Sequence, residues 1–340
     1  MGEETPIVQL EHVEVNFKKK TGLFQKPDYV NALHDINLSI RQGEVVVVVG
    51  ESGSGKTTMA NVVAGLVKPT QGNFHFHGSA LHDMNKQAKT EYRSKVQMVQ
   101  QDSYASLNPM RKIIKTLGDP LVIKKIASAR DVEEQVARFL EIVELTPPEN
   151  FIHKYPHQLS GGQRQRMLIA RAISMNPQLI LADEPVSMID VSLRVAVLNL
   201  LARLNQERKI AIMYITHDLA TARYVGKDGR IAVMYLGQII ETGNLQEVIA
   251  NPQHPYLRAL LSAVPIPNPR IARLPRESII KTAEETSRGI PAGCRFHPRC
   301  AYCQDICKQQ IPEMLPHEAS VVACHRVKEL PKFNLYQTID

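Results

Sequence analysis

The stretch Val45-Val46-Val47-Val48-Val49-Gly50-Glu51-Ser52-Gly53-Ser54-Gly55-Lys56-Thr57 decides the fold. Its five consecutive valines indicate a strand that is buried on both faces. The residues that follow have the spacing Gly-x4-Gly-Lys-Thr, in which glycines let the backbone approach a phosphate group closely. A helix-compatible stretch then runs from Lys56 to Leu66. The sequence therefore predicts a strand, a phosphate-binding P-loop and a helix whose N-terminus attracts negative charge.

This loop predicts a nucleotide site. Lys56 is expected to reach the β- and γ-phosphates, and the Thr57 hydroxyl is expected to ligate Mg²⁺. Each predicted ATP-binding residue of the loop is expected to turn its backbone N–H group or its side chain toward the phosphates. These residues are Gly50, Glu51, Ser52, Gly53, Ser54, Gly55, Lys56, Thr57 and Thr58.

The flanking sequence predicts an α/β architecture. Buried strands are expected at 179–182 and 210–215, with a helix between them at about 191–207. This alternation indicates a parallel sheet covered on both faces. Alternating apolar residues over 6–17 and 29–40 predict strands of an N-terminal antiparallel β subdomain, and residues 111–146 have helical spacing.

Two strand ends add polar side chains to the predicted site. Asp183 and Glu184 directly follow the apolar run that ends at Ala182. An acidic residue at this place holds the metal in P-loop proteins, so Asp183 is assigned to Mg²⁺ and Glu184 to activating water as a general base. His217 follows the next buried strand, at the edge of the sheet where ligands bind, and is expected to contact the γ-phosphate.

A second glycine-bearing loop lies at Leu159-Ser160-Gly161-Gly162-Gln163, immediately before a probable helix over 164–172. Its small residues and hydroxyl at a helix N-terminus indicate another potential anion site. Either the chain binds two ligands, or one ligand is gripped from two sides, as in a dimer in which each nucleotide is closed by the partner's loop. The spacing does not decide between them.

These motifs, in this order, resemble the ATP-binding subunit of an ABC transporter over about residues 6–250. The resemblance implies a P-loop NTPase sheet, an inserted helical subdomain at about 102–174, and a head-to-tail dimer with ATP at its interface. Ser160, Gly161, Gly162 and Gln163 would then contact the nucleotide of the partner. Gln101 matches the glutamine that senses Mg²⁺ and touches the membrane subunits. Phe17 matches the aromatic residue that stacks on adenine.

Two further stretches resemble the oligopeptide/dipeptide permease branch: Ser106-Leu107-Asn108-Pro109 and Asn251-Pro252-Gln253-His254-Pro255-Tyr256. The insertion with Lys18–Lys20 and Gly22-Leu23-Phe24 is similar to the second, F-type ATPase subunit of such systems. The resemblance implies ATP-driven peptide import with a homologous D-type ATPase partner, two multi-span permease subunits and an external substrate-binding protein. It places the chain on the cytoplasmic face of the cell membrane as a peripheral subunit.

The expected domains are residues 1–250 for the ATP-binding domain and 251–340 for an irregular, Cys-rich C-terminal extension. Eleven of the 21 prolines fall between Pro252 and Pro331, and all five cysteines lie between Cys294 and Cys324. In this branch four cysteines resemble a [4Fe–4S] site, and the matching positions are Cys294, Cys300, Cys307 and Cys324, which leaves Cys303 as an extra. Two alternatives stay open: tetrahedral zinc, which the pair Cys300-x2-Cys303 with nearby His297 or His325 would suit, and no metal at all.

Composition adds weaker constraints. The chain has 340 residues, a formal net charge of +7, no tryptophan and 5% aromatic residues. The basic charge permits contact with nucleic acid, but stacking platforms are scarce, and we expect no nucleic-acid partner. Three alternatives stay open: an importer ATPase for another cargo such as an oligosaccharide or nickel, a soluble ABC ATPase acting on nucleic acid, and a redox sensor built on the cysteines.

Overall fold

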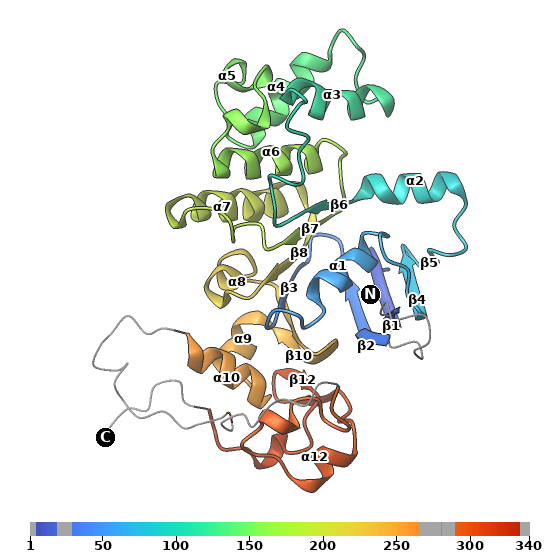
Figure 1. Ribbon diagram of the computed structural model, residues 1–340, viewed down its shortest axis with the longest axis vertical. Helices are drawn as coiled ribbons and strands as arrows, with labels where there is room; N and C mark the ends of the chain where they lie inside the picture. The colour runs from blue at the N-terminus through green and yellow to red at the C-terminus, as the bar shows by residue number, and fades with distance from the viewer. Residues whose placement is uncertain (1–4, 19–28, 265–279, 281–289, 334–340) are drawn as a thin grey trace, which may run out of the picture.

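The computed structural model describes residues 5–18, 29–264, 280 and 290–333 (Figure 1). A helical region lies at one end of the long axis, the principal sheet lies in the middle, and the C-terminal module lies at the other end. We call residues 290–333 the cysteine module. Lys19, Lys20 and the Gly22–Phe24 stretch of the basic insertion lie outside the described residues. None of the helices within the described ranges is both long and apolar enough to cross a membrane.

The principal sheet has eight strands in the order β11-β12-β10-β9-β3-β8-β7-β6. The five from β9 to β6 pair in parallel, while β10, β12 and β11 are antiparallel to their neighbours. Their bounds are β3 Val45–Val49, β6 Val96–Val99, β7 Leu179–Asp183, β8 Ala211–Thr216, β9 Arg230–Tyr235, β10 Gln238–Asn244, β11 Leu315–His317 and β12 Ser320–Val322. The predicted α/β class with a parallel sheet is thereby confirmed.

Strand β3 shows why the valine run is continuous. Val45, Val47 and Val49 belong to one hydrophobic core, and Val46 and Val48 belong to the other. Because side chains alternate between the faces of a strand, a strand covered on both sides needs apolar residues at every position. All five valines are buried, which fixes the strand end from which the phosphate loop leaves.

Helices cover both faces of this sheet (Figure 1). Helix α1 (Lys56–Val63) packs in the core that contains Val46 and Val48. It ends earlier than the expected 56–66, because Gly65 takes φ +69° just beyond it. Among the helices that follow β7 in the chain, those that contribute to the other core are α7 Val191–Arg208, α8 Leu219–Val225, α9 Leu245–Ala250 and α10 Pro255–Ala263.

The N-terminal antiparallel sheet has the strand order β2-β1-β4-β5. Its strands are β1 Val8–Lys18, β2 Tyr29–Ile40, β4 Gln71–Phe76 and β5 Ser79–Ala80, and helix α2 (Lys86–Lys95) follows. The expectation of strands at 6–17 and 29–40 agrees with β1 and β2. The two strands pair directly, with Phe17 opposite Val30, so β2 carries Tyr29 to Ala32 toward the phosphate loop.

The helical region consists of α3 Ile113–Ile123, α4 Val132–Ile142, α5 Glu149–Ile152 and α6 Gly161–Ile173. The residues expected to be helical over 111–146 form two helices, because the chain turns at Lys125 with φ +57°. Buried Leu117, Val136 and Leu140 join this region to the same core as Val47. Met167 and Ile169 of α6 belong to this core too, so α6 packs on the sheet while its N-terminus carries the second glycine loop.

The cysteine module is more regular than expected. Its hairpin of β11 and β12 pairs with β10, through Glu241 opposite Val322, and so extends the principal sheet. Short helical turns η2 (His297–Arg299) and η3 (Val327–Glu329) and helix α12 (Asp305–Gln309) make up much of the remainder. The strands were not anticipated because each has three residues, too few to show an alternating pattern.

Candidate functional site

The phosphate loop connects β3 to α1 and depends on its glycines at two places. A Cβ on Gly50 would lie 2.3 Å from the Met234 carbonyl oxygen, so a side chain there would collide with β9. Gly55 takes φ +100° as the N-cap of α1, a conformation that L-residues rarely adopt. No side chain caps this helix, so its first N–H groups face the loop without an internal partner.

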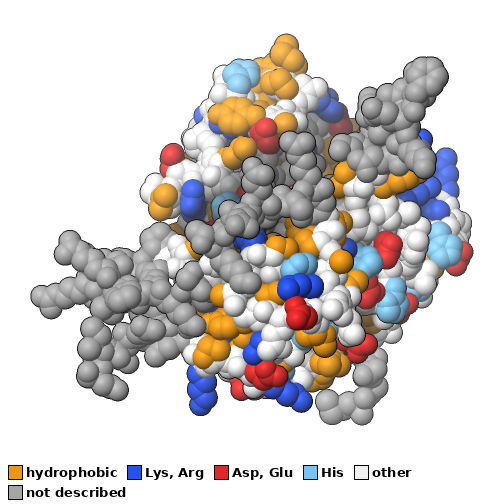
Figure 2. Space-filling view, turned by 60° about the horizontal axis from the view of Figure 1, so that its bottom comes forward, with side chains coloured by type: hydrophobic (Ala, Val, Ile, Leu, Met, Phe, Trp, Pro, Cys, Tyr) orange, Lys and Arg blue, Asp and Glu red, His pale blue; other side chains and the backbone are white. Residues whose placement is uncertain are grey.

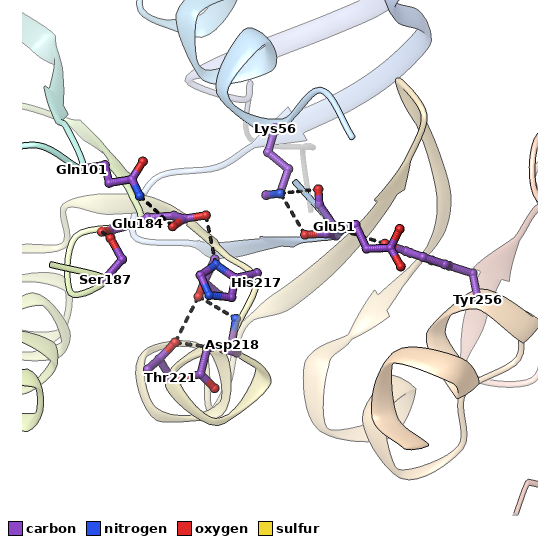
Figure 3. A network of polar contacts seen from close by, with 11 residues as sticks. Glu51, Lys56, Gln101, Glu184, Ser187, His217, Asp218, Thr221 and Tyr256 are labelled. Carbon is purple, nitrogen blue, oxygen red and sulfur yellow. Dashed lines mark hydrogen bonds and ion pairs between the residues drawn. The ribbon is translucent and has the colours of Figure 1, made fainter. Parts of the chain in front are cut away.

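Lys56 closes the loop on itself. Its Nζ donates to the carbonyl oxygens of Gly50 and Glu51, each at 2.8 Å (Figure 3). Lys56 is buried, and burial lowers the pKa of its ammonium group, although Glu184 and Asp183 oppose this effect. A buried cation that is held only by neutral carbonyls is well placed to exchange them for a more strongly attracting anion.

Asp183 lies at the end of β7 next to Thr57. It is buried, and burial raises the pKa of its carboxyl group, while a hydrogen bond from the Thr57 hydroxyl lowers it. The structure therefore brings together the hydroxyl and the carboxylate that were assigned to Mg²⁺ on different segments of the chain. These hard oxygen donors suit that ion.

Glu184 is the centre of a polar network at the strand ends (Figure 3). Gln101 Nε2 donates to Glu184 Oε2 at 3.1 Å, and His217 Nδ1 lies 3.0 Å from Glu184 Oε1. The backbone of Glu184 has φ +44° and its N–H donates to the Ile215 carbonyl oxygen at 3.0 Å, which turns the side chain out of β7. The sequence placed Glu184 and His217 at one edge of the sheet, and Gln101 was singled out by family resemblance, but the contacts among the three were not predicted.

A cavity of about 1050 Å³ joins these groups. The predicted site residues that line it are Ser52, Gly53, Gly55, Lys56, Thr57, Thr58, Gln101, Glu184 and His217. Four predicted site residues of the loop and the end of β7 do not line the cavity: Gly50, Glu51, Ser54 and Asp183. The cavity is large enough for a nucleotide, since ligand pockets typically measure about 300–1,000 Å³.

Aromatic side chains lie on the β2 side of this cavity. Phe17, which was predicted to stack on adenine, is 43% exposed on β1 opposite Val30 but is not part of the lining. Tyr29 lines the cavity and is 58% exposed. The sequence analysis missed Tyr29, which stands at the start of a strand and carries no motif. The adenine-stacking role of Phe17 stays a prediction.

The second glycine loop lies elsewhere. Ser160, Gly161, Gly162 and Gln163 are not among the described residues that line the Lys56 cavity. Ser160 is the N-cap of α6: its hydroxyl accepts from the Gln163 N–H at 3.3 Å, and Gln163 Oε1 accepts from the Ser160 N–H at 3.0 Å. Within one chain, the two loops therefore do not face the same ligand.

The cysteine module contains a small cavity of about 20 Å³, lined by Cys294, Cys300, Cys307 and Cys324 but not by Cys303. The five cysteines are all described and form no disulfide. Burial raises the pKa of three of these thiols, to about 11 for Cys294 and Cys300 and about 12 for Cys324. The space suits about one water molecule. Within the described ranges, no three His, Cys, Asp or Glu side chains are placed to hold one ion.

The phosphate loop on a parallel sheet, the carboxylates after β7 and the inserted helices define an ATP-binding cassette of the ABC class. Comparison with known families agrees, because the family model "ABC transporter" matches residues 33–187. A second model, "Oligopeptide/dipeptide transporter, C-terminal region", matches residues 240–307. The chain belongs to the family of ATP-binding subunits of oligopeptide/dipeptide ABC transporters.

Curated relatives match nearly the whole chain. The dipeptide transport ATP-binding protein DppF of Haemophilus influenzae is 38% identical over 96% of this chain and 98% of its own length. The oligopeptide transport ATP-binding protein AppF of Bacillus subtilis is 40% identical over 94% of this chain and 97% of its own. The resemblance drawn from the motifs is thereby confirmed, and as a member of this family the chain is an ABC ATPase.

Solved structures support the same fold. The ATP-binding cassette MJ0796, described as a dimer in a post-hydrolysis state bound to ADP and Pi, superposes with a TM-score of 0.60. It is 32% identical, and the match covers 70% of this chain and 98% of that one. The structure of cbiO1 from Clostridium perfringens, part of the ABC transporter complex cbiONQ, has a TM-score of 0.62 and 26% identity over 79% of this chain.

Proposed function

We propose that this chain hydrolyses ATP to power the import of oligopeptides or dipeptides through separate membrane subunits. The observation that carries the proposal is the convergence of Lys56, Glu184 and His217 on one cavity. The peptide cargo rests on the match of residues 240–307 to the oligopeptide/dipeptide transporter region and on relatives named for peptide transport.

Each group at the cavity has a role in phosphoryl transfer. Lys56 exchanges its contacts with the loop carbonyls for the β- and γ-phosphates. Thr57 and Asp183 would hold Mg²⁺, and the ion would supply positive charge that neutralises the phosphates. Glu184 accepts a proton from the attacking water as a general base. Gln101 and His217 hold the Glu184 carboxylate from two sides at 3.1 and 3.0 Å, so its orientation is fixed before water arrives.

The second glycine loop completes the site of a partner. None of its residues lines the chain's own cavity, which favours the interpretation that one ATP is bound between two chains, and the similar cassette MJ0796 is described as a dimer. We propose that Ser160, Gly161, Gly162 and Gln163 contact the nucleotide of a homologous D-type ATPase subunit. The relatives are named as ATP-binding proteins of transport systems, which supports two permease subunits, an external substrate-binding protein and a peripheral place on the cytoplasmic membrane face.

Reconstitution tests this function. The chain would be co-purified with its homologous ATPase and two permease subunits, inserted into proteoliposomes, and supplied with ATP and an external binding protein loaded with labelled di-, tri- and oligopeptides. We expect uptake that requires ATP and is lost with Glu184→Gln. Uptake of an oligosaccharide or of nickel, without uptake of any peptide, would show that the cargo is not a peptide. Co-purification with RNA or DNA instead of membrane subunits would overturn the transport function.

We also propose that Cys294, Cys300, Cys307 and Cys324 bind a metal centre, with a [4Fe–4S] cluster favoured and zinc as the alternative. The support is that these four thiols, without Cys303, surround one cavity. Four thiolates suit either centre, although the cavity must widen to admit it. Protein purified without oxygen should contain about four iron and four sulfide per chain. One zinc ion per chain would exclude the cluster. The absence of both metals would exclude either centre. Cysteine replacements that abolish turnover but preserve ATP binding would favour redox sensing.

A further inference from the structure

Glu51, the second residue of the phosphate loop, has all three of its polar groups engaged, and Figure 3 shows the contacts of its backbone with Lys56 and Tyr256. Lys56 Nζ donates to its carbonyl oxygen at 2.8 Å. Its backbone N–H donates to the hydroxyl oxygen of Tyr256 at 2.7 Å. Its carboxylate accepts two hydrogen bonds from Arg299, at 2.7 and 2.9 Å. Two of the three contacts therefore come from residues more than 200 positions away, on α10 and in the cysteine module.

The cysteine module fixes Arg299 through its own hydrogen bonds. Arg299 is the last residue of the turn η2. The segment just before this turn is held in the module because the Cys294 N–H donates to the Cys307 carbonyl oxygen at 2.8 Å. The Arg299 N–H donates to the Phe296 carbonyl oxygen at 3.0 Å. Phe296 is buried and its ring packs at 5.6 Å from that of Tyr256. The two groups that hold Glu51 are thus parts of one packed unit.

A second arginine of this unit reaches the other side of the nucleotide cavity. Arg295, which is buried, donates to the Leu236 carbonyl oxygen and, at 3.2 Å, to Asn31 Oδ1. Both acceptor residues line the cavity. The neighbouring Gly237 N–H donates to the Ser54 carbonyl oxygen at 2.9 Å, so this turn also holds the phosphate loop. The cysteine module therefore contacts the nucleotide site at two places, through Arg299 and through Arg295.

Charge explains why the Arg299 contact matters for a triphosphate. The Glu51 side chain is 42% exposed and adjoins Ser52, which lines the cavity. An uncompensated carboxylate there would repel bound phosphates. The forked, two-bond contact of a guanidinium neutralises that carboxylate and fixes its direction, which a single ammonium contact would not do.

Figure 2 turns the C-terminal end of the molecule forward and shows Lys and Arg side chains among Asp and Glu side chains on this face. The described residues of this face therefore offer no broad surface of a single charge that would act on the nucleotide at a distance. Direct contacts, such as that between Arg299 and Glu51, connect the cysteine module to the site.

We propose that the cysteine module positions the phosphate loop, and that Arg299 is the positioning residue that neutralises Glu51 and keeps the loop ready for ATP. A change in this module, whether by substitution or by altered occupancy of its cysteines, then changes the ATP affinity of a site that contains none of its cysteines. The inference rests on ATP binding by the chain.

A four-protein comparison tests this role. Dissociation constants for Mg²⁺-ATP are measured by titration calorimetry for the wild type, Arg299→Ala, Glu51→Gln and the double variant. Arg299→Ala should weaken binding roughly fivefold when Glu51 is present, the scale of a partly exposed ion pair. With Gln at position 51 the same change should weaken binding less than about twofold, because no unpaired carboxylate remains.

The matched control is Lys308→Ala, which removes an exposed ion pair with Asp305 at 2.8 Å in the same module but away from the loop. Its dissociation constant should stay within about twofold of the wild type, as expected for an exposed pair. Equal losses from Arg299→Ala in both backgrounds would show a merely structural effect and overturn the proposal, as would no loss in either. A wild type that binds no ATP would instead overturn the function itself.

Discussion

The molecule contains two helices that begin at glycine-bearing loops, and the two loops are prepared for their ligands in different ways. Helix α1 begins at Gly55 without a side-chain cap, and its loop lies in the cavity with Glu184. Helix α6 begins at Ser160 with a capping box, and its loop does not line that cavity. The first loop lies beside the catalytic groups of its own chain. In the second loop, the Ser160 hydroxyl is already hydrogen-bonded to its own helix.

This difference teaches how work is divided between the loops. A helix N-terminus without a cap needs an external partner for its N–H groups, which favours a permanent phosphate site. A capped N-terminus is stable without a ligand and can expose its hydroxyl to a neighbour when two chains meet. We therefore expect changes near the first loop to alter ATP binding or turnover directly, and changes at the second to matter only in the assembled pair.

Glu184→Gln should give the largest effect. Glutamine keeps the size of the side chain but accepts no proton, so turnover should fall by about 10²–10⁴, the usual contribution of a general base. ATP binding should stay within about threefold, since the Lys56 loop is untouched. Phosphate release by the assembled complex and equilibrium binding of ATP by the chain measure the two separately. Undiminished release would remove Glu184 from the reaction.

Lys56→Ala comes next and acts on binding. The change removes a buried cation from the centre of the phosphate loop, and hydrogen bonds to charged groups contribute about 1.5–3 kcal/mol. We expect ATP affinity to fall roughly 10- to 100-fold. The control is Lys86→Ala on the exposed face of α2, which should leave affinity unchanged. An unchanged dissociation constant for Lys56→Ala would mean that the loop does not hold the triphosphate.

Much of the first loop could be predicted from sequence because its determinants are contiguous. The valines of β3, the glycines and Lys56 lie within twelve consecutive positions, and each local rule points to the same structure. Asp183 and Glu184 were also found, because their strand is a short apolar run with a clear end. Tyr29 was missed because one tyrosine at the start of a strand has no pattern.

The contacts of the C-terminal region could not be predicted for a different reason. Arg299 and Glu51 are 248 positions apart, and nothing in either local sequence specifies the other. The pairing depends on how β10, the hairpin and α10 pack, and packing is a property of the whole fold. The four cysteines were singled out by family resemblance, and their shared cavity emerges only in three dimensions.

Ser160→Ala should separate the two loops. It removes the cap of α6, at a stability cost of about 0.5–2 kcal/mol, and the hydroxyl expected to meet the partner's nucleotide. Turnover of the assembled complex should fall about tenfold, the loss of one hydrogen bond to a charged group, while ATP binding by the isolated chain changes less than about twofold.

The control for the lost cap is Asn85→Ala, which removes the cap of α2, where Asn85 Oδ1 accepts from the Ala88 N–H at 2.8 Å. Its stability cost should match that of Ser160→Ala, but turnover should not change. If both variants lowered turnover equally, the effect of Ser160 would be one of folding. If Ser160→Ala weakened ATP binding by the isolated chain, the two loops would serve the same chain.

Glycine replacements change stability by the smallest free energies among these variants and give the sharpest structural contrast between the two loops. Gly55→Ala forces a side chain into the left-handed region, at about 1–2 kcal/mol, and brings its Cβ to 2.7 Å from the Ala32 carbonyl oxygen. For Gly162→Ala, the nearest atom to the new Cβ is the flexible end of Leu193 at 3.1 Å, and the other neighbours lie at ordinary contact distances. Alanine also gains about 0.5–1 kcal/mol over glycine within a helix. The free energy of unfolding, measured in denaturant, should fall clearly for the first and by nearly nothing for the second. Equal losses in the free energy of unfolding would mean that its own chain constrains the loop before α6 as tightly as it constrains the phosphate loop. That result would contradict the proposal that this loop binds a ligand of the partner chain.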